Sequence, residues 1–242
     1  MEEAKSGVHR LSKSELKEYF QKDGTVSVWW EPEEDENYSQ YYIEERSDLI
    51  RLTQPEGKVV LDMGKGRLAI ALAKAGAKAI IGADISREMI KIARIRAKAN
   101  GVADKIMMCN CDAEHLPFTD GFFPAVCCIQ IFPHLPNPLD SMRELARVVQ
   151  KGGLVATDAI VEHFFRRFVV SLYYNRFMWP SRAIIHKMFG KPLERLEYHS
   201  TTVVNSFSKG FFQSLFEKAD LRVVHTERYN IFLFALAKKM IG

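Results

Sequence analysis

The stretch Val59–Ser86, VVLDMGKGRLAIALAKAGAKAIIGADIS, decides the fold. It opens with a short apolar run interrupted by Asp62, passes through two glycines and continues with apolar residues at helical spacing. A second apolar run, AIIGA, follows and ends at Asp84, twenty positions after Gly64. This order predicts a strand, a glycine turn, a helix and a second strand that ends in a carboxylate.

Such a turn suits a nucleotide cofactor. Glycine lets backbone N–H groups approach a ligand closely, and the start of the following helix carries a partial positive charge. Asp84 is placed to accept hydrogen bonds from both hydroxyls of a ribose. The alternative interpretation of Asp84 is a carboxylate that caps the helix beginning near Ser86.

The alternation of strand and helix continues along the chain. Strands are predicted near 58–63, 78–83, 104–109, 122–130, 153–158, 221–228 and 230–238, and helices near 67–76, 86–100 and 138–150. Two N-terminal helices are predicted from about Ser14 and about Tyr38. Alternation of this kind builds a parallel sheet with helices on both faces, and the last two strands form a closing hairpin.

From Lys58 to Asp158 the chain resembles the class I S-adenosylmethionine-dependent methyltransferases, in particular the small-molecule branch that includes ubiquinone and menaquinone biosynthesis methyltransferases. Besides the glycine turn, the likeness is carried by ISREMIKIARIRAKANG, by CDAEHLPFTDGFFPAVCCIQIFPHL and by NPLDSMRELARVVQKGGLVATD. The resemblance implies a Rossmann-like α/β fold, a doubly wound, mostly parallel seven-stranded sheet with an antiparallel last strand. It also implies S-adenosylmethionine as cofactor, S-adenosylhomocysteine as product and methyl transfer to a small molecule.

The glycine turn departs from the family pattern. That pattern usually reads D-x-G-x-G-x-G, often followed by R-x-A, whereas this chain has DMGKGRLA from Asp62 to Ala69. Either Leu68 replaces the third glycine, or two residues including one glycine are missing. We favour the shorter turn, because ALAKAGA then falls in its usual place. A shorter turn offers fewer amides to the methionine end of the cofactor.

The resemblance predicts a set of cofactor contacts in the turn and at the strand ends. They are Asp62, Met63, Gly64, Lys65, Gly66, Asp84, Ile85, Met89, Asp112, Ala113 and Gln130. Asp112 matches the adenine side, with a solvated loop acid as the alternative, and Gln130 is expected to face the sulfonium. Ile85 and Met89 fit either the adenine ring or the core. Asp62 is expected to order the turn and to reach the amino group of the methionine moiety, or to be a purely structural carboxylate.

Residues on the substrate side are predicted on both flanks of the core. His134 is either a general base or a structural residue. The aromatic candidates for lining the substrate are Tyr38, Tyr42, Phe165, Tyr173 and Trp179. Packing onto the sheet is the alternative for the two N-terminal tyrosines, which fall on one helical face.

Four parts of the chain are expected. They are an N-terminal helical cap (1–57), a cofactor-binding α/β core (58–160), a helical lid or substrate insertion (161–205) and a C-terminal helix with a β-hairpin that completes the sheet (206–242). The aromatic and basic insertion is interpreted either as a lid, with peripheral membrane contact through 161–200, or as a helical subdomain that forms its own core or a homodimer contact.

Composition limits the class of protein. The chain has 242 residues, of which 47% are hydrophobic and 26% charged, an ordinary globular balance. The acidic start MEEAKSGVHR and the absence of a long uncharged run favour a cytoplasmic protein. Residues 1–45 hold five basic and twelve acidic side chains, whereas 161–200 hold seven basic and three acidic ones. Its four cysteines lack the spaced pairs of a zinc site, and no metal is expected.

The leading hypothesis is a methyltransferase acting on a small, hydrophobic or anionic molecule through oxygen, nitrogen or carbon. The alternative from another class is a catalytically impaired cofactor-binding regulatory or scaffold protein, produced by the shortened turn. RNA methylation is disfavoured, because the segment after the fourth strand reads IQIFPHL rather than an Asn/Asp-Pro-Pro-aromatic motif.

Overall fold

The computed structural model describes residues 12–22, 39–161, 207–229 and 232–241. Seven strands lie in one sheet: β1 (Val59–Met63), β2 (Ala79–Asp84), β3 (Ile106–Asn110), β4 (Phe123–Cys128), β5 (Val149–Ile160), β6 (Leu221–Tyr229) and β7 (Phe232–Lys239). The helices are α1 (Lys13–Lys22), α2 (Ser39–Thr53), α3 (Arg67–Lys74), α4 (Arg87–Ala99), α5 (Pro138–Val148) and α9 (Lys209–Glu217), with a short 3-10 helix η2 (Phe132–His134).

The strand order is β3-β2-β1-β4-β5-β7-β6. The first five strands run parallel, and β7 runs antiparallel to both β5 and β6. This confirms the predicted α/β class with a mostly parallel seven-stranded sheet. After β1 the chain builds outward through β2 and β3 and then returns to the other side of β1 with β4. The carboxyl ends of β1 and β4 therefore mark the switch point, where open α/β sheets bind ligands.

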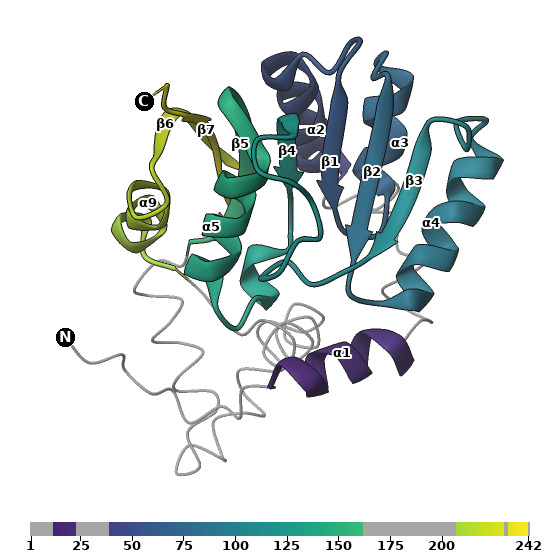
Figure 1. Ribbon diagram of the computed structural model, residues 1–242, viewed down its shortest axis with the longest axis horizontal. Helices are drawn as coiled ribbons and strands as arrows, with labels where there is room; N and C mark the ends of the chain where they lie inside the picture. The colour runs from purple at the N-terminus through teal and green to yellow at the C-terminus, as the bar shows by residue number, and fades with distance from the viewer. Residues whose placement is uncertain (1–11, 23–38, 162–206, 230–231, 242) are drawn as a thin grey trace, which may run out of the picture.

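Each face of the sheet carries its own hydrophobic core. One core joins Leu61 and Val126 of the sheet to buried residues of α5 and α9, such as Met142 and Phe212. The other joins Val60 and its neighbours to α2, α3 and α4. Figure 1 shows α5 in front of the sheet with α2 and α3 behind it. The alternation of side chains along each strand thus produces a three-layer domain.

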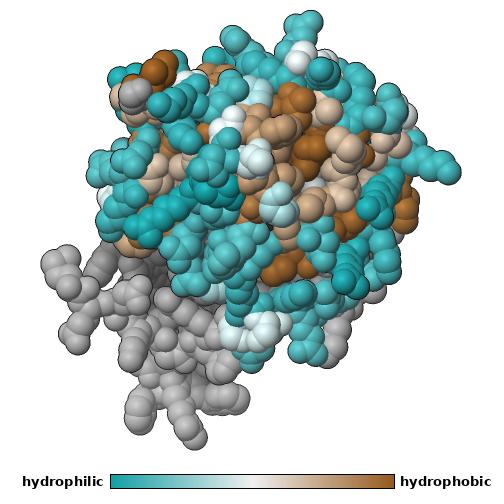
Figure 2. All heavy atoms as spheres, viewed as in Figure 1, coloured by the Kyte–Doolittle hydropathy of each residue, from teal (hydrophilic) through white to brown (hydrophobic). Residues whose placement is uncertain are grey.

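The front of β1, β2 and β3 is apolar at its surface (Figure 2). A loop, rather than a helix, connects β3 to β4. Met107 of β3 is 58% exposed, and Phe122 of the loop is 52% exposed. Within the described ranges, no helix combines the length and apolar character needed to cross a bilayer.

The start of β5 differs from the prediction. The helix expected to reach residue 150 ends at Val148, and β5 begins at the next residue instead of near residue 153. The register against β4 shifts between the Phe123–Val149 pair and the Ala125–Leu154 pair, so the Gly-Gly turn lies inside an irregular part of the strand. A Cβ atom at Gly153 would lie 2.9 Å from the carbonyl oxygen of Pro124, which explains why glycine is needed there.

The first helix also begins earlier than expected. Ser12, rather than Ser14, precedes its first turn, and the backbone N–H of Ser12 donates to Glu15 at 2.7 Å. The Ser12 hydroxyl accepts from the Glu15 N–H at 3.4 Å, which completes a capping box.

Candidate cofactor site

The glycine turn occupies only three residues between β1 and α3. Gly64 and Gly66 have φ angles of 121° and 78°, in the left-handed region that favours glycine. Gly66 is the N-cap of α3, so Leu68 already lies within the helix. This arrangement supports the interpretation that the turn is shortened and that Gly66 takes the place of the last family glycine. The N–H of Gly64 donates to the Ala83 carbonyl at 2.8 Å, which ties the turn to β2.

Gly66 also lets α3 and α4 approach each other. A Cβ atom at this position would lie 2.7 Å from the Cβ of Ala93, closer than two carbon atoms can pack. We expect Gly66→Ala to lower the free energy of unfolding by about 2–4 kcal/mol, from the left-handed backbone and the overpacking together. Urea unfolding followed by circular dichroism measures this loss.

Gly57→Ala is the matched control, because it measures the cost of placing alanine in a left-handed backbone without the overpacking. Gly57 has a φ angle of 69°, but its added Cβ would have nothing within 4 Å. We expect this variant to lose only about 1 kcal/mol. Equal losses in the two variants would show that the contact with Ala93 does not matter.

Asp62 anchors the start of α3 from the end of β1. Its side chain is 2% exposed and accepts the backbone N–H of Ala69, the third residue of the helix. Burial raises the pKa of the Asp62 carboxyl to about 7, against the opposing effects of the Ala69 hydrogen bond and the Arg67 charge. Because Gly66 has no side chain, Asp62 supplies the capping acceptor that the turn lacks. This contact agrees with the predicted role in ordering the turn.

Asp84 ends β2 beside the turn. Its Oδ1 accepts the backbone N–H of Ser86 at 2.8 Å. Burial raises the pKa of the Asp84 carboxyl to about 6, while the N–H of Ser86 and the charge of Lys65 act in the opposite direction. The side chain of Ser86 caps α4 by accepting from the Met89 N–H at 3.3 Å. Ser86, rather than Asp84, is therefore the N-cap of α4, and the ribose contact of Asp84 stays a prediction.

The two apolar candidates for the adenine ring lie close to Asp84. Met89 is 5% exposed and packs with Ile92 in a small cluster separate from the two main cores. Ile85 is half-buried. Their contact with adenine stays a prediction.

The loop between β3 and β4, residues 111–122, is called the adenine-side loop here because the family resemblance predicts adenine contacts in it. Helix α1 holds this loop in place. Asp112 forms an ion pair with Lys13, and its Oδ1 accepts the N–H of Glu114 at 3.0 Å. Lys13 also donates to Glu114 at 2.8 Å, and the Glu114 carboxylate accepts from Asn137 as well. Ala113 is buried between these residues in the chain. Asp112 therefore already has protein partners, which gives it a role in organising the loop whether or not it also contacts adenine.

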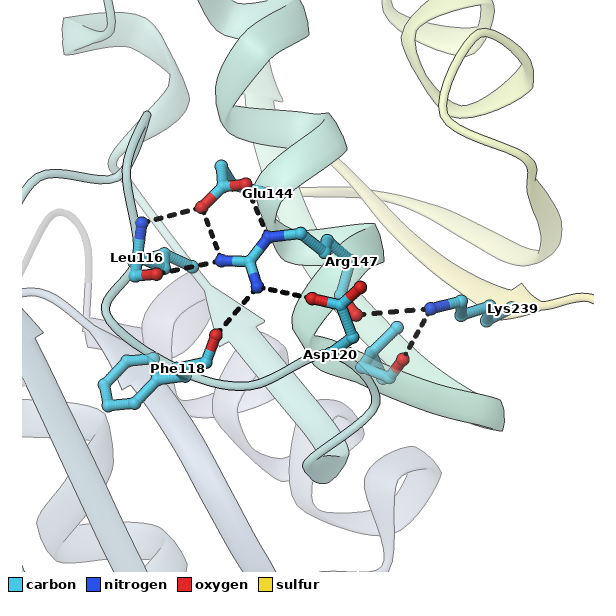
Figure 3. A network of polar contacts seen from close by, with 7 residues as sticks. Leu116, Phe118, Asp120, Glu144, Arg147 and Lys239 are labelled. Carbon is cyan, nitrogen blue, oxygen red and sulfur yellow. Dashed lines mark hydrogen bonds and ion pairs between the residues drawn. The ribbon is translucent and has the colours of Figure 1, made fainter.

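The same loop is clamped from its other end by Arg147 of α5 (Figure 3). The guanidinium donates to the carbonyl oxygens of Leu116 and Phe118 at 2.8 and 2.7 Å. It also donates to both carboxylate oxygens of Glu144 and to Asp120. Glu144 in turn accepts the Leu116 N–H at 2.7 Å. Lys13 and Arg147 were both missed at the sequence level, because nothing local links them to residues 112–120.

Gln130 and Asp158 meet at the carboxyl ends of β4 and β5. The N–H of Gln130 donates to Asp158 Oδ1 at 2.6 Å, and Gln130 has a φ angle of 61°, which is unusual for a residue other than glycine. Asp158 is completely buried, and burial raises the pKa of its carboxyl to about 7. Asp158 was not among the predicted site residues. Its position after the apolar run GGLVAT, like that of Asp84 after AIIGA, was the available signal.

Tyr42 of α2 packs over this edge of the sheet. It is 6% exposed, its hydroxyl lies beside the side chain of Gln130, and the Arg67 guanidinium lies 5.0 Å from its ring centroid. Burial raises the pKa of the Tyr42 hydroxyl above its usual value. The arrangement gives Tyr42 a packing role and still places it beside the proposed reaction centre.

The other substrate-side predictions divide into two groups. His134 ends η2 and is half-buried, with its backbone N–H bound to the Ile131 carbonyl at 2.8 Å. Ile131 lies over the glycine turn, with its Cδ1 3.3 Å from where a Gly64 Cβ would stand. Four predicted substrate residues lie outside the described residues, as does almost all of the 161–205 insertion: Tyr38, Phe165, Tyr173 and Trp179.

Two of the four cysteines, Cys127 and Cys128, lie in the central strand β4, whereas Cys109 lies in the edge strand β3 and Cys111 in the loop that follows it. Cys127 and Cys128 are fully buried, and burial raises the pKa of both thiols well above the usual value. This keeps them protonated and favours their interpretation as core residues. In the part of the chain that the structure describes, no three His, Cys, Asp or Glu side chains gather in a way that could hold a metal ion.

Comparison with known proteins agrees with this geometry. The family described as "Methyltransferase domain" matches residues 49–157, from α2 through most of β5. The chain is thus similar to this methyltransferase family over slightly less than half of its length. The family's cofactor is S-adenosylmethionine. The matched segment contains every cofactor-contact residue predicted from the sequence, from Asp62 to Gln130, but it leaves out Asp158.

Curated relatives of this methyltransferase domain include two with different names. The methyltransferase GfsG of Streptomyces halstedii is 36% identical over 46% of this chain and 41% of its own length. A ubiquinone biosynthesis O-methyltransferase of Sodalis glossinidius is 30% identical over 64% of this chain and 63% of its own length. The chain thus spans less than two thirds of these relatives.

Solved structures share the fold at low identity. Magnesium protoporphyrin IX methyltransferase from Synechocystis PCC 6803, with bound S-adenosylhomocysteine, is 15% identical, with a TM-score of 0.68 over 94% of this chain and 100% of that one. The [4+2]-cyclase SpnF is 17% identical, with a TM-score of 0.69 over 98% of this chain and 100% of that one. Because one neighbour is named as a methyltransferase and the other as a cyclase, the fold by itself does not decide the reaction.

The residues present fit the family cofactor. The sulfonium and ammonium of S-adenosylmethionine are cations, and the carboxyl edge of the sheet carries the buried acids Asp62 and Asp158 and the half-buried Asp84. Asp158 Oδ2 and Gln130 Nε2 are buried polar atoms with no hydrogen-bond partner among the described residues. Groups of this kind are expected where a polar ligand completes the site.

Proposed function

We propose that this chain methylates a hydroxyl group of a small, hydrophobic or anionic molecule, using S-adenosylmethionine as the methyl donor. The observation that carries the proposal is the placement of the glycine turn at the carboxyl end of β1 and of Asp84 at the carboxyl end of the neighbouring strand β2, next to the switch point. The choice of oxygen as acceptor rests on the names of relatives such as the ubiquinone biosynthesis O-methyltransferase of Sodalis glossinidius.

Each part of the site has a role in this proposal. Asp84 accepts the ribose hydroxyls, and the turn from Gly64 to Gly66 brings the backbone close to the methionine arm. Arg67, at the start of α3, adds positive charge for the carboxylate of that arm. This charge compensates for the amides that the shortened turn lacks.

The chemistry requires little of the protein beyond alignment. When bound, S-adenosylmethionine would supply an activated methyl group, and its transfer to an acceptor oxygen would break the methyl–sulfur bond and leave S-adenosylhomocysteine. The site residues hold the acceptor at near-attack distance and exclude water. His134 is the side chain we assign to removing the acceptor's proton, since η2 follows β4 at the same edge of the sheet.

Titration calorimetry with S-adenosylmethionine and S-adenosylhomocysteine tests the cofactor part of the proposal. We expect both to bind with micromolar dissociation constants. If neither ligand binds, the proposal is contradicted, and the shortened turn has removed the site.

Transfer of a labelled methyl group to a panel of phenols and hydroxy acids tests the reaction. Methylation of any compound in the panel supports the proposed methyltransferase activity. Cofactor binding without turnover across hydroxyl, amine and carbon acceptors would favour the regulatory or scaffold alternative.

The predicted homodimer and membrane contacts depend on residues 161–200, which lie outside the described residues. Light scattering of the purified chain measures the oligomeric state. Sedimentation with anionic and neutral vesicles measures membrane contact, and binding to the anionic vesicles alone would indicate the basic side chains of this segment.

A further inference from the structure

Two polar residues that are 28 positions apart in the chain, Gln130 and Asp158, meet near the carboxyl ends of β4 and β5. Asp158 Oδ1 already accepts the Gln130 N–H, but Asp158 Oδ2 and Gln130 Nε2 have no hydrogen-bond partner within the described ranges. An unsatisfied buried carboxyl oxygen costs free energy unless a ligand completes it. The left-handed backbone of Gln130 adds strain at the same point, a feature that gathers at functional sites.

The charge around Asp158 indicates which kind of ligand group fits. Arg67 from the start of α3 is the basic group that acts on Asp158. Tyr42 of α2 and Cys128 of β4 are neutral groups close enough to Asp158 for its charge to act on them. A cationic ligand group at Asp158 would be stabilised by the ionised carboxylate, while the charge of Arg67 acts in the opposite direction.

The place of Asp158 in the sheet limits which end of the cofactor it can meet. Asp84 ends β2, and β5 lies three strand spacings away across the switch point, about 14 Å between backbones. A nucleoside held at β2 therefore extends its amino-acid arm toward β4 and β5. Asp62 is less suited to bind that arm because it already accepts the N–H of Ala69.

We propose that Asp158, held in place by the Gln130 backbone, is the counter-ion for the cationic end of S-adenosylmethionine and sets the preference for this cofactor over S-adenosylhomocysteine. The inference rests on the proposed function. The two ligands share an ammonium group, but only S-adenosylmethionine carries the sulfonium charge. A nearby carboxylate therefore stabilises the methyl donor more than the product, which limits product inhibition.

Asp158→Asn tests this assignment, because asparagine keeps an oxygen for the Gln130 N–H and removes the charge. We expect the dissociation constant for S-adenosylmethionine to rise about 30-fold and that for S-adenosylhomocysteine about 3-fold, each measured by titration calorimetry. Asp140→Asn is the control, since the Asp140 side chain is 57% exposed on α5 and pairs with Arg143 rather than with a residue of the site. This control should leave both constants unchanged.

The assignment would be overturned if Asp158→Asn lowers the affinity for both ligands by the same factor, or if it leaves both affinities unchanged. Failure of the wild-type chain to bind either ligand would instead overturn the proposed function, so the two failures are distinguishable. A thermal unfolding scan of each variant checks that it folds.

The wild-type chain provides a second test that needs no variant. Asp158 is ionised above about pH 7, so the affinity for S-adenosylmethionine relative to S-adenosylhomocysteine should rise severalfold between pH 6 and pH 8. Asp62 titrates in the same range, and its hydrogen bond to Ala69 is present with either ligand. A ratio that stays constant over this range would contradict the role of Asp158.

Discussion

Replacing Asp84 by alanine raises the dissociation constant for S-adenosylmethionine and for S-adenosylhomocysteine by about 100- to 1000-fold. The reason is the loss of a carboxylate that accepts hydrogen bonds from two ribose hydroxyls, each worth about 1.5–3 kcal/mol when the acceptor is charged. Both ligands carry the same ribose, so the affinity for each should fall by the same factor. Titration calorimetry of the full chain measures the two constants.

Asp84 also accepts the Ser86 N–H, and the design must separate this structural contact from the ligand contact. Asp84→Asn keeps an oxygen for Ser86 and should still weaken both ligands at least tenfold. Asp104→Ala removes an exposed carboxylate from the loop before β3 and should have no effect. Unchanged affinity in Asp84→Ala would refute the ribose assignment.

The pH dependence of binding gives an independent check on Asp84. Burial raises the pKa of its carboxyl to about 6, above the usual value of 3.8. A group whose pKa is raised by folding contributes stability at low pH that is lost as the pH rises through the folded value. Ribose hydroxyls favour the ionised carboxylate, so ligand binding should tighten between about pH 5 and pH 7.

Replacing Arg147 by alanine lowers the free energy of unfolding by about 2–4 kcal/mol, a large part of the stability of a domain. The guanidinium loses contacts to two backbone carbonyls and two carboxylates (Figure 3). The loss should be moderate rather than extreme, because the side chain is 31% exposed and water can replace part of the contacts. Urea unfolding measures the change.

Arg143→Ala is the matched control on the same helix. Arg143 pairs with Asp140, and both side chains are 57% exposed, so this variant should change the stability by less than about 0.5 kcal/mol. Because Arg147 holds the adenine-side loop, Arg147→Ala should also weaken cofactor binding severalfold. Equal stabilities of the two variants would show that the clamp contributes nothing.

Most of the sheet could be predicted from the sequence because its strands are continuous apolar runs separated by helical repeats. The observed bounds of β1, β2 and β4 lie within about two residues of those predicted. Errors arose where local pattern was ambiguous, as at Val149, where the helix passes directly into the strand. The irregular register beside Pro124 has no signature other than two adjacent glycines.

The candidate site was predicted where it follows chain order and missed where it depends on distant contacts. Asp62 and Asp84 follow apolar runs within one strand–turn–helix–strand unit, so local pattern reveals both. Lys13 meets Asp112 although the two are 99 positions apart in the chain, and no local feature predicts that contact. Asp158 had a local signal, its position at the end of an apolar run, but its burial and its bond to Gln130 depend on the pairing of β4 with β5.

The sequence by itself determined the class of fold, the family resemblance and the order of strand, glycine turn, helix and acid, because hydrophobic period and turn chemistry are local properties. Only the tertiary structure decided that Asp112 binds Lys13, that Arg147 clamps the adenine-side loop and that Asp158 is buried with one oxygen lacking a partner. These features depend on burial and on side chains brought together by sheet pairing. Both arise only when distant segments pack.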